Sequence, residues 1–79
     1  MVEDMVEFHI IGQEGCRYCA MAQAELIERD LPYKYRVMNP RLVRYFKRKR
    51  YKTVPQIYHK GKHLGGYTGL MDYLKEIGK

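Results

Sequence analysis

Two cysteines are the residues of this 79-residue sequence best suited to covalent chemistry, and they are its only two. They stand three positions apart as Cys16 and Cys19, directly after Gly15. An apolar run at residues 5–11 precedes them, and a helical pattern of small and apolar residues begins at Cys16. A Cys-x-x-Cys pair at a strand-to-helix junction is typical of proteins that exchange thiols and disulfides. The sequence therefore predicts redox chemistry at this junction.

The expected position of Cys16 makes it the reactive member of the pair. The first residues of a helix present unpaired N–H groups and the positive end of the macrodipole, and both favour an anion. The thiolate is that anion, and it is the nucleophilic form of cysteine. Arg17 adds a cation beside it. Cys19 lies one helical turn further along, so the two sulfurs can meet and close a disulfide.

Two other interpretations of the cysteines compete with this one. Both could be inert residues of a core-facing helix. They could also form half of a zinc site with His59 and His63, whose spacing matches that of zinc-finger histidines. However, residues 20–58 separate the two halves, far more than the roughly dozen residues of the finger pattern. Residues 60–62, with a central glycine, also favour a hairpin turn, so we expect redox chemistry and no metal.

The apolar pattern predicts an α/β fold in the order β-α-β-α-β-β-α. The expected segments are a strand at 5–11, a loop at 12–15, a helix from Cys16 to about Arg29, a strand at 33–38, a helix from Asn39-Pro40, a hairpin of 53–59 and 63–66 joined at 60–62, and a last helix. The first strand, helix and second strand form a right-handed unit with parallel strands.

Particular side chains are expected to cap the helices and to face the core. Asn39 would cap its helix, with Pro40 in the first helical position. Thr68 would cap the last helix. In the first helix the expected apolar stripe is Cys19, Ala22 and Leu26, with a second row of Ala20, Ala24 and Ile27. The second helix has Leu42, Val43 and Phe46, and the last helix has Leu70, Leu74 and Ile77.

Length and composition limit the class of protein. The chain can bury one small core, so we expect a single domain spanning 1–79. A hydrophobic content of 46% argues against disorder, and the absence of a long apolar run argues against a membrane span or membrane contact. The acidic start lacks the pattern of a signal peptide, which favours a reducing, cytoplasmic location. Two cysteines there are more often catalytic than structural. We expect a monomer.

Positive charge is the remaining compositional signal. The net charge of +6 suggests anionic partners without identifying them. Five of the six residues from Lys47 to Lys52 are cations. The simplest interpretation is the solvated end of a helix, where cations suit the dipole. The alternatives are a docking patch for an acidic partner and a nucleic-acid patch, and a single short run is weak evidence for the last.

Three motifs, taken in order, resemble the glutaredoxin family. They are Cys16-Arg17-Tyr18-Cys19, Thr53-Val54-Pro55-Gln56-Ile57 and Gly65-Gly66-Tyr67-Thr68. The expected element order matches as well, so the similarity covers essentially the whole chain, which looks like a small dithiol glutaredoxin of the bacterial or phage type. The resemblance implies a thioredoxin-like fold with a four-stranded mixed sheet in the order 2-1-3-4 and helices on both faces. It also implies that Pro55 is cis and packs beside the cysteines.

The resemblance further implies glutathione as a co-substrate, with no bound cofactor. By this analogy, the backbone of Val54 pairs in antiparallel fashion with the cysteine arm of glutathione. Tyr18 and Thr53 would line the groove. The start of the last helix is an anion site, and the resemblance assigns the γ-glutamyl end to the residues there, Gly66, Tyr67 and Thr68.

Three positions depart from the family pattern. Arg17 stands where many glutaredoxins have proline, which changes the charge beside the nucleophile. Gln13 is neutral where many members carry a cation for the glycine carboxylate of glutathione, and Gly69 replaces a common Asp. The last two departures weaken the expected hold on glutathione, although Arg17 or a cation of the Lys47–Lys52 run could substitute for Gln13.

The leading interpretation is a glutathione-dependent thiol–disulfide oxidoreductase that acts on protein disulfides and glutathione mixed disulfides. By family analogy, ribonucleotide reductase is one candidate protein substrate. A second interpretation keeps the chemistry but draws electrons from thioredoxin reductase, which Gln13 and Gly69 would favour. A third is a basic module that binds nucleic acid or an acidic protein. It ranks lowest because no base-stacking motif accompanies the charge.

Overall fold

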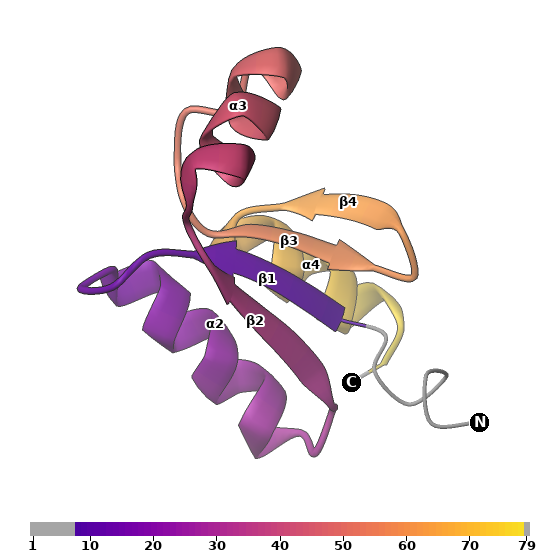
Figure 1. Cartoon of the computed structure of the whole chain (residues 1–79). Helices are drawn as coiled ribbons and strands as arrows, with labels where there is room; N and C mark the ends of the chain where they lie inside the picture. The colour runs from indigo at the N-terminus through magenta and orange to yellow at the C-terminus, as the bar shows by residue number, and fades with distance from the viewer. Residues whose placement is uncertain (1–7, 79) are drawn as a thin grey trace.

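The computed structural model describes residues 8–78, so the part of the first predicted strand at residues 5–7 lies outside the described residues. The elements are β1 (Phe8–Gly12), α2 (Arg17–Glu28), β2 (Tyr33–Val37), α3 (Pro40–Lys49), β3 (Gln56–His59), β4 (Lys62–Gly65) and α4 (Tyr67–Glu76). This order confirms the prediction (Figure 1). Gly12 ends β1 rather than opening the loop, and Lys62 already belongs to β4, so the hairpin turn is shorter than predicted.

The four strands form one mixed sheet in the order β2-β1-β3-β4. Strand β1 pairs in parallel with β2, from Phe8 opposite Tyr33 to Gly12 opposite Val37. It pairs in antiparallel fashion with β3, which in turn pairs with β4. Both the parallel unit and the order 2-1-3-4 are therefore as predicted. The carboxyl end of β1 and the amino end of β3 meet at one edge of the sheet, where the cysteines follow.

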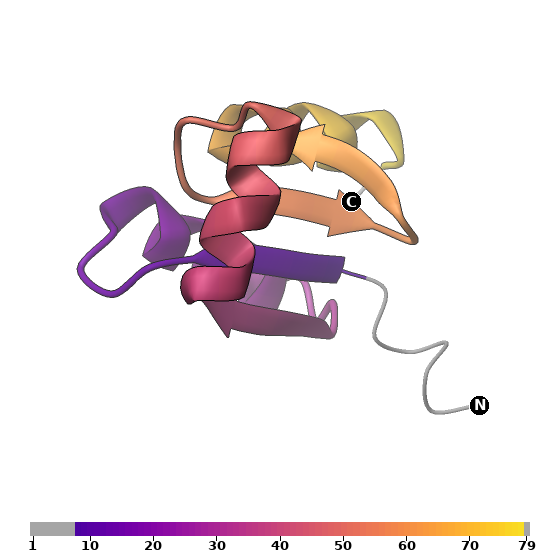
Figure 2. The same ribbon diagram turned by 45° about the horizontal axis from the view of Figure 1, so that its top comes forward.

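The helices lie on both faces of the sheet (Figure 2). Helices α2 and α4 cover one face, and α3 crosses the other. The main core lies between the sheet and the pair α2 and α4, and its buried members are Phe8, Ile10, Ala22, Leu26, Ile57, Leu70 and Leu74. Among the described residues, no helix is long and apolar enough to cross a membrane.

The second apolar row predicted for α2 is not part of this core. Ala20 and Ala24 are exposed, and Ile27 is 62% exposed. A helix that packs on one face of a sheet buries a single stripe, and here that stripe holds Cys19 and Leu26. The prediction of a wide buried face was therefore wrong. In α3, Phe46 of the expected stripe is buried whereas Val43 is exposed.

The caps follow the prediction in α3 but not in α4. Asn39 Oδ1 accepts a hydrogen bond from the Leu42 N–H at 2.8 Å, and Pro40 is the first helical residue. The N-cap of α4 is Gly66, with no side-chain cap, so the assignment of Thr68 was wrong. Helix α4 begins directly after β4, which places Thr68 inside the first turn. Ile77 lies just past the other end and is 40% exposed.

Candidate active site

Cys16 is the N-cap residue of α2, and the two cysteines form a disulfide. Its backbone is extended, with φ −89° and ψ 114°, and its Sγ accepts a hydrogen bond from the Cys19 N–H at 3.2 Å. The Cα atoms of Cys16 and Cys19 are 5.2 Å apart. The predicted strand-to-helix junction and the meeting of the two sulfurs are therefore both present. The helix start directs a backbone N–H at the Cys16 sulfur, which favours the thiolate when the pair is reduced.

The two sulfurs differ in their access to solvent. Cys19 is only 1% exposed, whereas Cys16 is half-buried. The backbone of Gly12 passes so close that a Cβ there would lie 2.9 Å from the Cys19 Sγ and would overlap the Tyr35 ring. Glycine at this position therefore lets the end of β1 close over the inner sulfur. An incoming substrate can reach Cys16 first.

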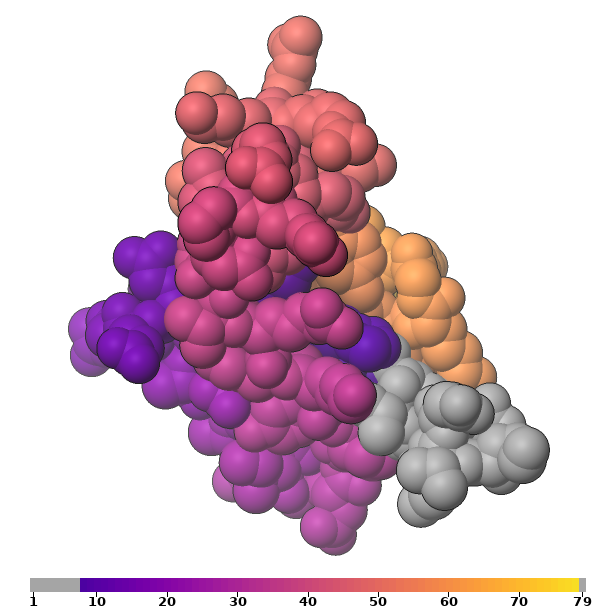
Figure 3. Space-filling model, viewed as in Figure 1, coloured from indigo at the N-terminus to yellow at the C-terminus, as the bar shows by residue number. Residues whose placement is uncertain are grey.

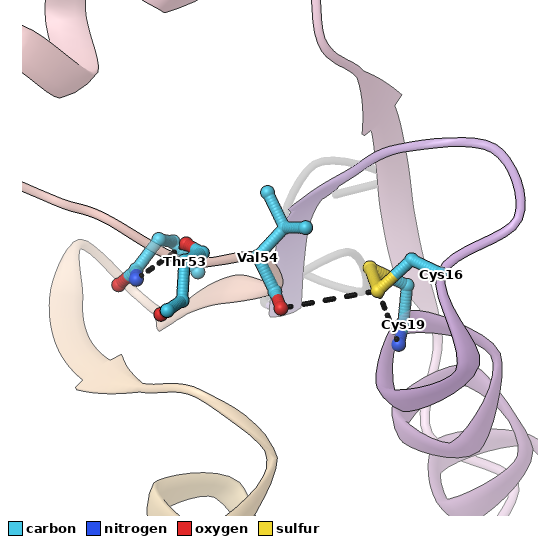
Figure 4. The surroundings of a disulfide bond; sticks show 5 residues. Cys16, Cys19, Thr53 and Val54 are labelled. Atoms are coloured by element: carbon cyan, nitrogen blue, oxygen red, sulfur yellow. Dashed lines mark hydrogen bonds between the residues drawn. A yellow bond between two sulfur atoms is a disulfide. The ribbon is translucent and has the colours of Figure 1, made fainter.

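The second motif faces the cysteines across the edge of the sheet. The Val54–Pro55 peptide bond is cis, as the resemblance implies, and Pro55 is buried. The carbonyl oxygen of Val54 lies 3.8 Å from the Cys16 Sγ, as Figure 4 shows. This places the backbone segment before β3 directly beside the outer sulfur.

A buried amide holds the segment before β3 in place. Gln56 is 6% exposed, and its Nε2 donates to the Thr53 carbonyl at 2.9 Å. Its Oε1 accepts from the Nε2–H of His63 at 2.6 Å. Burial, and then the charge of Lys49, lower the pKa of His63. Sequence reasoning did not identify this role of Gln56, because its partner on β4 lies seven positions away.

The third motif brings the start of α4 beside the second. A Cβ on Gly66 would lie at 3.5 Å from the Pro55 carbonyl oxygen, an ordinary contact distance. The ring of Tyr67 lies 5.9 Å from that of Tyr18, centroid to centroid. Cys16, Val54 and Gly66 thus lie around the buried Pro55 and form one surface, with Tyr18 and Tyr67 beside each other at the cysteine-bearing helix.

Glu25 of α2 holds the Tyr67 side chain in place. The Tyr67 hydroxyl donates to Glu25 Oε2 at 3.0 Å, and this bond raises the pKa of Tyr67. Arg29, first of all, and then Tyr67 lower the pKa of Glu25 by hydrogen bonding to its carboxylate. The Glu25–Arg29 pair has i,i+4 spacing, a signal available in the sequence. The contact to Tyr67 depends on packing of α4 against α2.

The remaining predicted residues lie at the exposed margin of the surface. The Gln13 carbonyl accepts from the Cys16 N–H at 3.3 Å, while its side chain is exposed. Arg17 is the exposed first residue of α2, and Tyr18 is 55% exposed. Thr53 and Thr68 are exposed as well. These side chains are open to solvent, and their contacts with glutathione stay a prediction.

Gly69 has a steric reason to be glycine. A Cβ at this position would overlap the carbonyl oxygen of Leu64 on β4. Helix α4 therefore approaches the hairpin more closely here than a side chain permits. This contact explains the departure from the family's common Asp without reference to any ligand.

The zinc interpretation is not supported by the arrangement of the histidines. His59 stacks on Phe8 at 4.2 Å and its Nδ1 bonds the Tyr73 hydroxyl of α4. His63 stacks instead on Tyr51, which follows α3. Within residues 8–78, no group of three or more His, Cys, Asp or Glu residues is placed to hold a metal ion.

The fold and the cysteine pair define a thiol–disulfide oxidoreductase with a thioredoxin-like fold. The chain belongs to the glutaredoxin family, whose model, described as Glutaredoxin, matches residues 7–64. No curated protein sequence gives a significant match.

Solved glutaredoxins share the fold along most of their length. That of Brucella melitensis is 32% identical, with a TM-score of 0.74 over 95% of this chain and 84% of that one. Reduced Escherichia coli glutaredoxin is 32% identical, with a TM-score of 0.62 over 87% and 93%. The buckwheat glutaredoxin–glutathione complex is 18% identical, with a TM-score of 0.75 over 99% and 78%.

Proposed function

We propose that this protein reduces protein disulfides and glutathione mixed disulfides with electrons from glutathione. The observation that carries the proposal is the Val54 carbonyl oxygen, 3.8 Å from the Cys16 Sγ. A short peptide whose sulfur reaches Cys16 must lie beside this backbone. It can then pair with Val54 as an added strand does. The structure of buckwheat glutaredoxin in complex with glutathione supports glutathione as this peptide.

The proposed reaction has two thiol–disulfide exchanges. The Cys16 thiolate attacks one sulfur of the substrate disulfide, and that S–S bond breaks; the released thiolate takes a proton from water. Cys19, deprotonated, then attacks the Cys16 sulfur of the mixed disulfide. The Cys16–Cys19 disulfide forms and the second substrate thiol leaves. Two electrons have passed from the protein to the substrate.

Two glutathione molecules return the protein to the dithiol. The first attacks Cys16 and forms a mixed disulfide, while Cys19 leaves as a thiol. The second attacks the glutathione sulfur, so glutathione disulfide departs and Cys16 is free. We propose that Tyr18, Thr53, Val54, Pro55, Gly66, Tyr67 and Thr68 contact glutathione during these steps, with Gln13 and Arg17 beside its glycine carboxylate.

Thioredoxin reductase is the alternative electron donor. The observation that favours it is Gln13, which is exposed and neutral where a cation is common in the family. Gly69 no longer supports this alternative, because its contact with Leu64 accounts for it. The alternative therefore rests on the single side chain of Gln13.

We also propose that the protein is a monomeric, cytoplasmic single domain over residues 1–79. Ribonucleotide reductase is the candidate protein substrate by family analogy. A module that binds nucleic acid through its net charge of +6 remains the least favoured alternative.

One experiment decides the reductant. Turnover of a glutathione mixed disulfide of a small thiol is followed by NADPH consumption, once with glutathione plus glutathione reductase and once with thioredoxin reductase alone. Activity only in the first mixture supports the proposal, and activity only in the second replaces it. Gln13→Lys is the matched variant, which should lower the KM for the mixed disulfide if the glycine carboxylate lies there.

A further inference from the structure

A groove lies between α3 and the sheet, on the face opposite the main core. Helix α3 stands away from the strands in Figure 1, and its cavity has a volume of about 610 Å³. In Figure 3 the indigo atoms of β1 show between the magenta of β2 and α3 and the orange of the hairpin. Cavities of this size hold small ligands or a few side chains of a peptide. The groove uses neither cysteine.

The floor of the groove is apolar and fixed. It contains Ile11 of β1 and Leu42 of α3, together with the rings of Tyr45 and Tyr58. The hydroxyl groups of Tyr45 and Tyr58 are 2.9 Å apart, and that of Tyr51 lies 2.7 Å from Tyr58. Because these hydroxyls hydrogen-bond to one another, the floor offers mainly carbon surface.

Three guanidinium groups surround this floor. Arg41 and Arg48 lie on α3 two turns apart, and Arg36 reaches the groove from β2. All three side chains are exposed. In the part of the chain from 8 to 78, none of them makes a hydrogen bond or an ion pair, and no Asp or Glu lines the groove. Among residues 8–78, no carboxylate therefore balances this positive charge, and the exposed arginines are open to an anionic partner.

We propose that this groove binds an acidic segment of a partner protein that carries one apolar anchor side chain. Arginine pairs with carboxylates through a two-pronged fork, and the floor between the arginines fits an aliphatic or aromatic group. The surface goes beyond the proposed function, because binding there requires no thiol and no glutathione. Arg48, which belongs to the basic run Lys47–Lys52, lines this groove.

A protein segment fits this groove better than a nucleic acid. Single-stranded nucleic acids need aromatic faces free for base stacking along a positive track. Here the ring of Tyr45 already contacts that of Tyr51, and the ring of Tyr58 contacts that of His63. The arginines line a single open groove rather than a long track. One buried anchor with acidic neighbours matches that geometry.

The groove also adjoins the candidate active site. Ile11 pairs with Gln56, the residue after Pro55. The Met38 N–H donates to the Gly12 carbonyl at 2.8 Å, so the entry to α3 is tied to the strand that leads to the cysteines. A partner held in the groove is therefore close to the edge of the sheet where Cys16 lies. This last consequence rests on the proposed function: in a protein that reduces protein disulfides, the groove would select substrates by sequence.

The test is a binding measurement on the full chain in its Cys16→Ser form, so that no disulfide exchange contributes. The probe is a fluorescent peptide with a central Phe flanked on each side by two Glu residues, followed by anisotropy at low salt. Arg41→Gln with Arg48→Gln removes two groove cations. Arg44→Gln with Lys47→Gln removes two exposed cations of the same helix outside the groove, so both double variants have the same net charge.

The proposal expects the groove variant to weaken binding about tenfold, since each partly solvated charge pair contributes modestly. The control variant should change affinity less than about twofold, consistent with screening of distant charges. Replacing the Phe of the probe with Ser should weaken binding to the unsubstituted groove. The backbone amide chemical shifts of Ile11 and Tyr58 should change when the peptide binds.

Three results would overturn it. Equal weakening by both double variants would mean that net charge alone attracts the peptide. Failure of the folded protein to bind the probe would mean that the groove is not a peptide site. Tighter binding of a single-stranded oligonucleotide, lost in the groove variant, would assign the surface to nucleic acid. None of these outcomes depends on the disulfide-exchange assays.

Discussion

The carbonyl oxygen of Val54 lies 3.8 Å from the Sγ of Cys16, although 37 residues (17–53) separate them in the chain. This contact joins the cysteine motif to the backbone segment that precedes Pro55. In the proposed function, a substrate peptide whose sulfur reaches Cys16 lies beside this carbonyl.

Cys16 should react with alkylating agents before Cys19. Its sulfur is at the helix start and half-buried, whereas Cys19 is 1% exposed. After reduction, limiting iodoacetamide at neutral pH should label Cys16 at least about tenfold faster, because thiolate character and access both favour it. Peptide mass mapping measures the ratio. Faster labelling of Cys19 would reverse the assignment of the nucleophile.

Cys19→Ser should separate the two kinds of substrate. A glutathione mixed disulfide needs only Cys16, because a second glutathione removes the first, so that activity should remain. Reduction of a protein disulfide should fall by about tenfold or more, since the mixed disulfide lacks its resolving thiol. Serine is close to cysteine in shape, and circular dichroism controls for folding. An unchanged rate on protein disulfides would contradict the dithiol mechanism.

Arg17 should increase the reactivity of Cys16 through its charge. It is the first residue of α2, where proline also fits. Arg17→Gln and Arg17→Pro should both slow alkylation of Cys16 at pH 7 by about two- to fivefold, the size of a helix-end charge effect. The redox potential should shift as well, while the fold stays intact. If neither variant changes the rate, the guanidinium has no electrostatic role.

Gly69→Ala should destabilise the protein, although alanine is the better helix former. Its Cβ would overlap the Leu64 carbonyl oxygen, and relieving that contact should cost about 1–3 kcal/mol of unfolding free energy. Gly66→Ala is the matched control, because its Cβ would meet Pro55 at an ordinary 3.5 Å. Urea denaturation measures both. A stabilised Gly69→Ala protein would show that propensity outweighs the contact.

Glu25 should contribute stability that acid removes. Arg29 and then Tyr67 lower its folded pKa below 4.5, so the contribution is complete above the unfolded value and is lost as pH falls through the folded one. Glu25→Gln should therefore lose less unfolding free energy on acidification, by under about 1 kcal/mol because the group is partly solvated. Denaturation curves at pH 6 and about pH 3 give the comparison, with Glu28→Gln on the same helix as control.

Local signals account for the parts of the protein that the sequence predicted. Asn39-Pro40 sets the start of α3 because a side-chain oxygen and a fixed φ act within one turn. The glycine between Lys60 and Lys62 marks the hairpin turn, which is also a local signal. The cysteine pair was identified by its spacing and by its place at a strand-to-helix junction, and three separated motifs then indicated the family.

Other features depended on residues that are distant in the chain. The sequence of α2 contains two apolar rows, and only the position of the sheet determines that Leu26 is buried and Ile27 exposed. The need for glycine at position 69 follows from the close approach of the Leu64 carbonyl oxygen. The hydrogen bond between Glu25 and Tyr67 forms because α4 packs against α2. The sequence offered only the Lys47–Lys52 run as a possible docking patch, and the groove beneath α3 joins Arg48 of that run to Arg36 only after folding. Periodicity, capping and turn chemistry act within a few residues, so the sequence by itself determined the elements and the reactive pair. Burial and side-chain partnership depend on how those elements pack, and only the tertiary structure decided them.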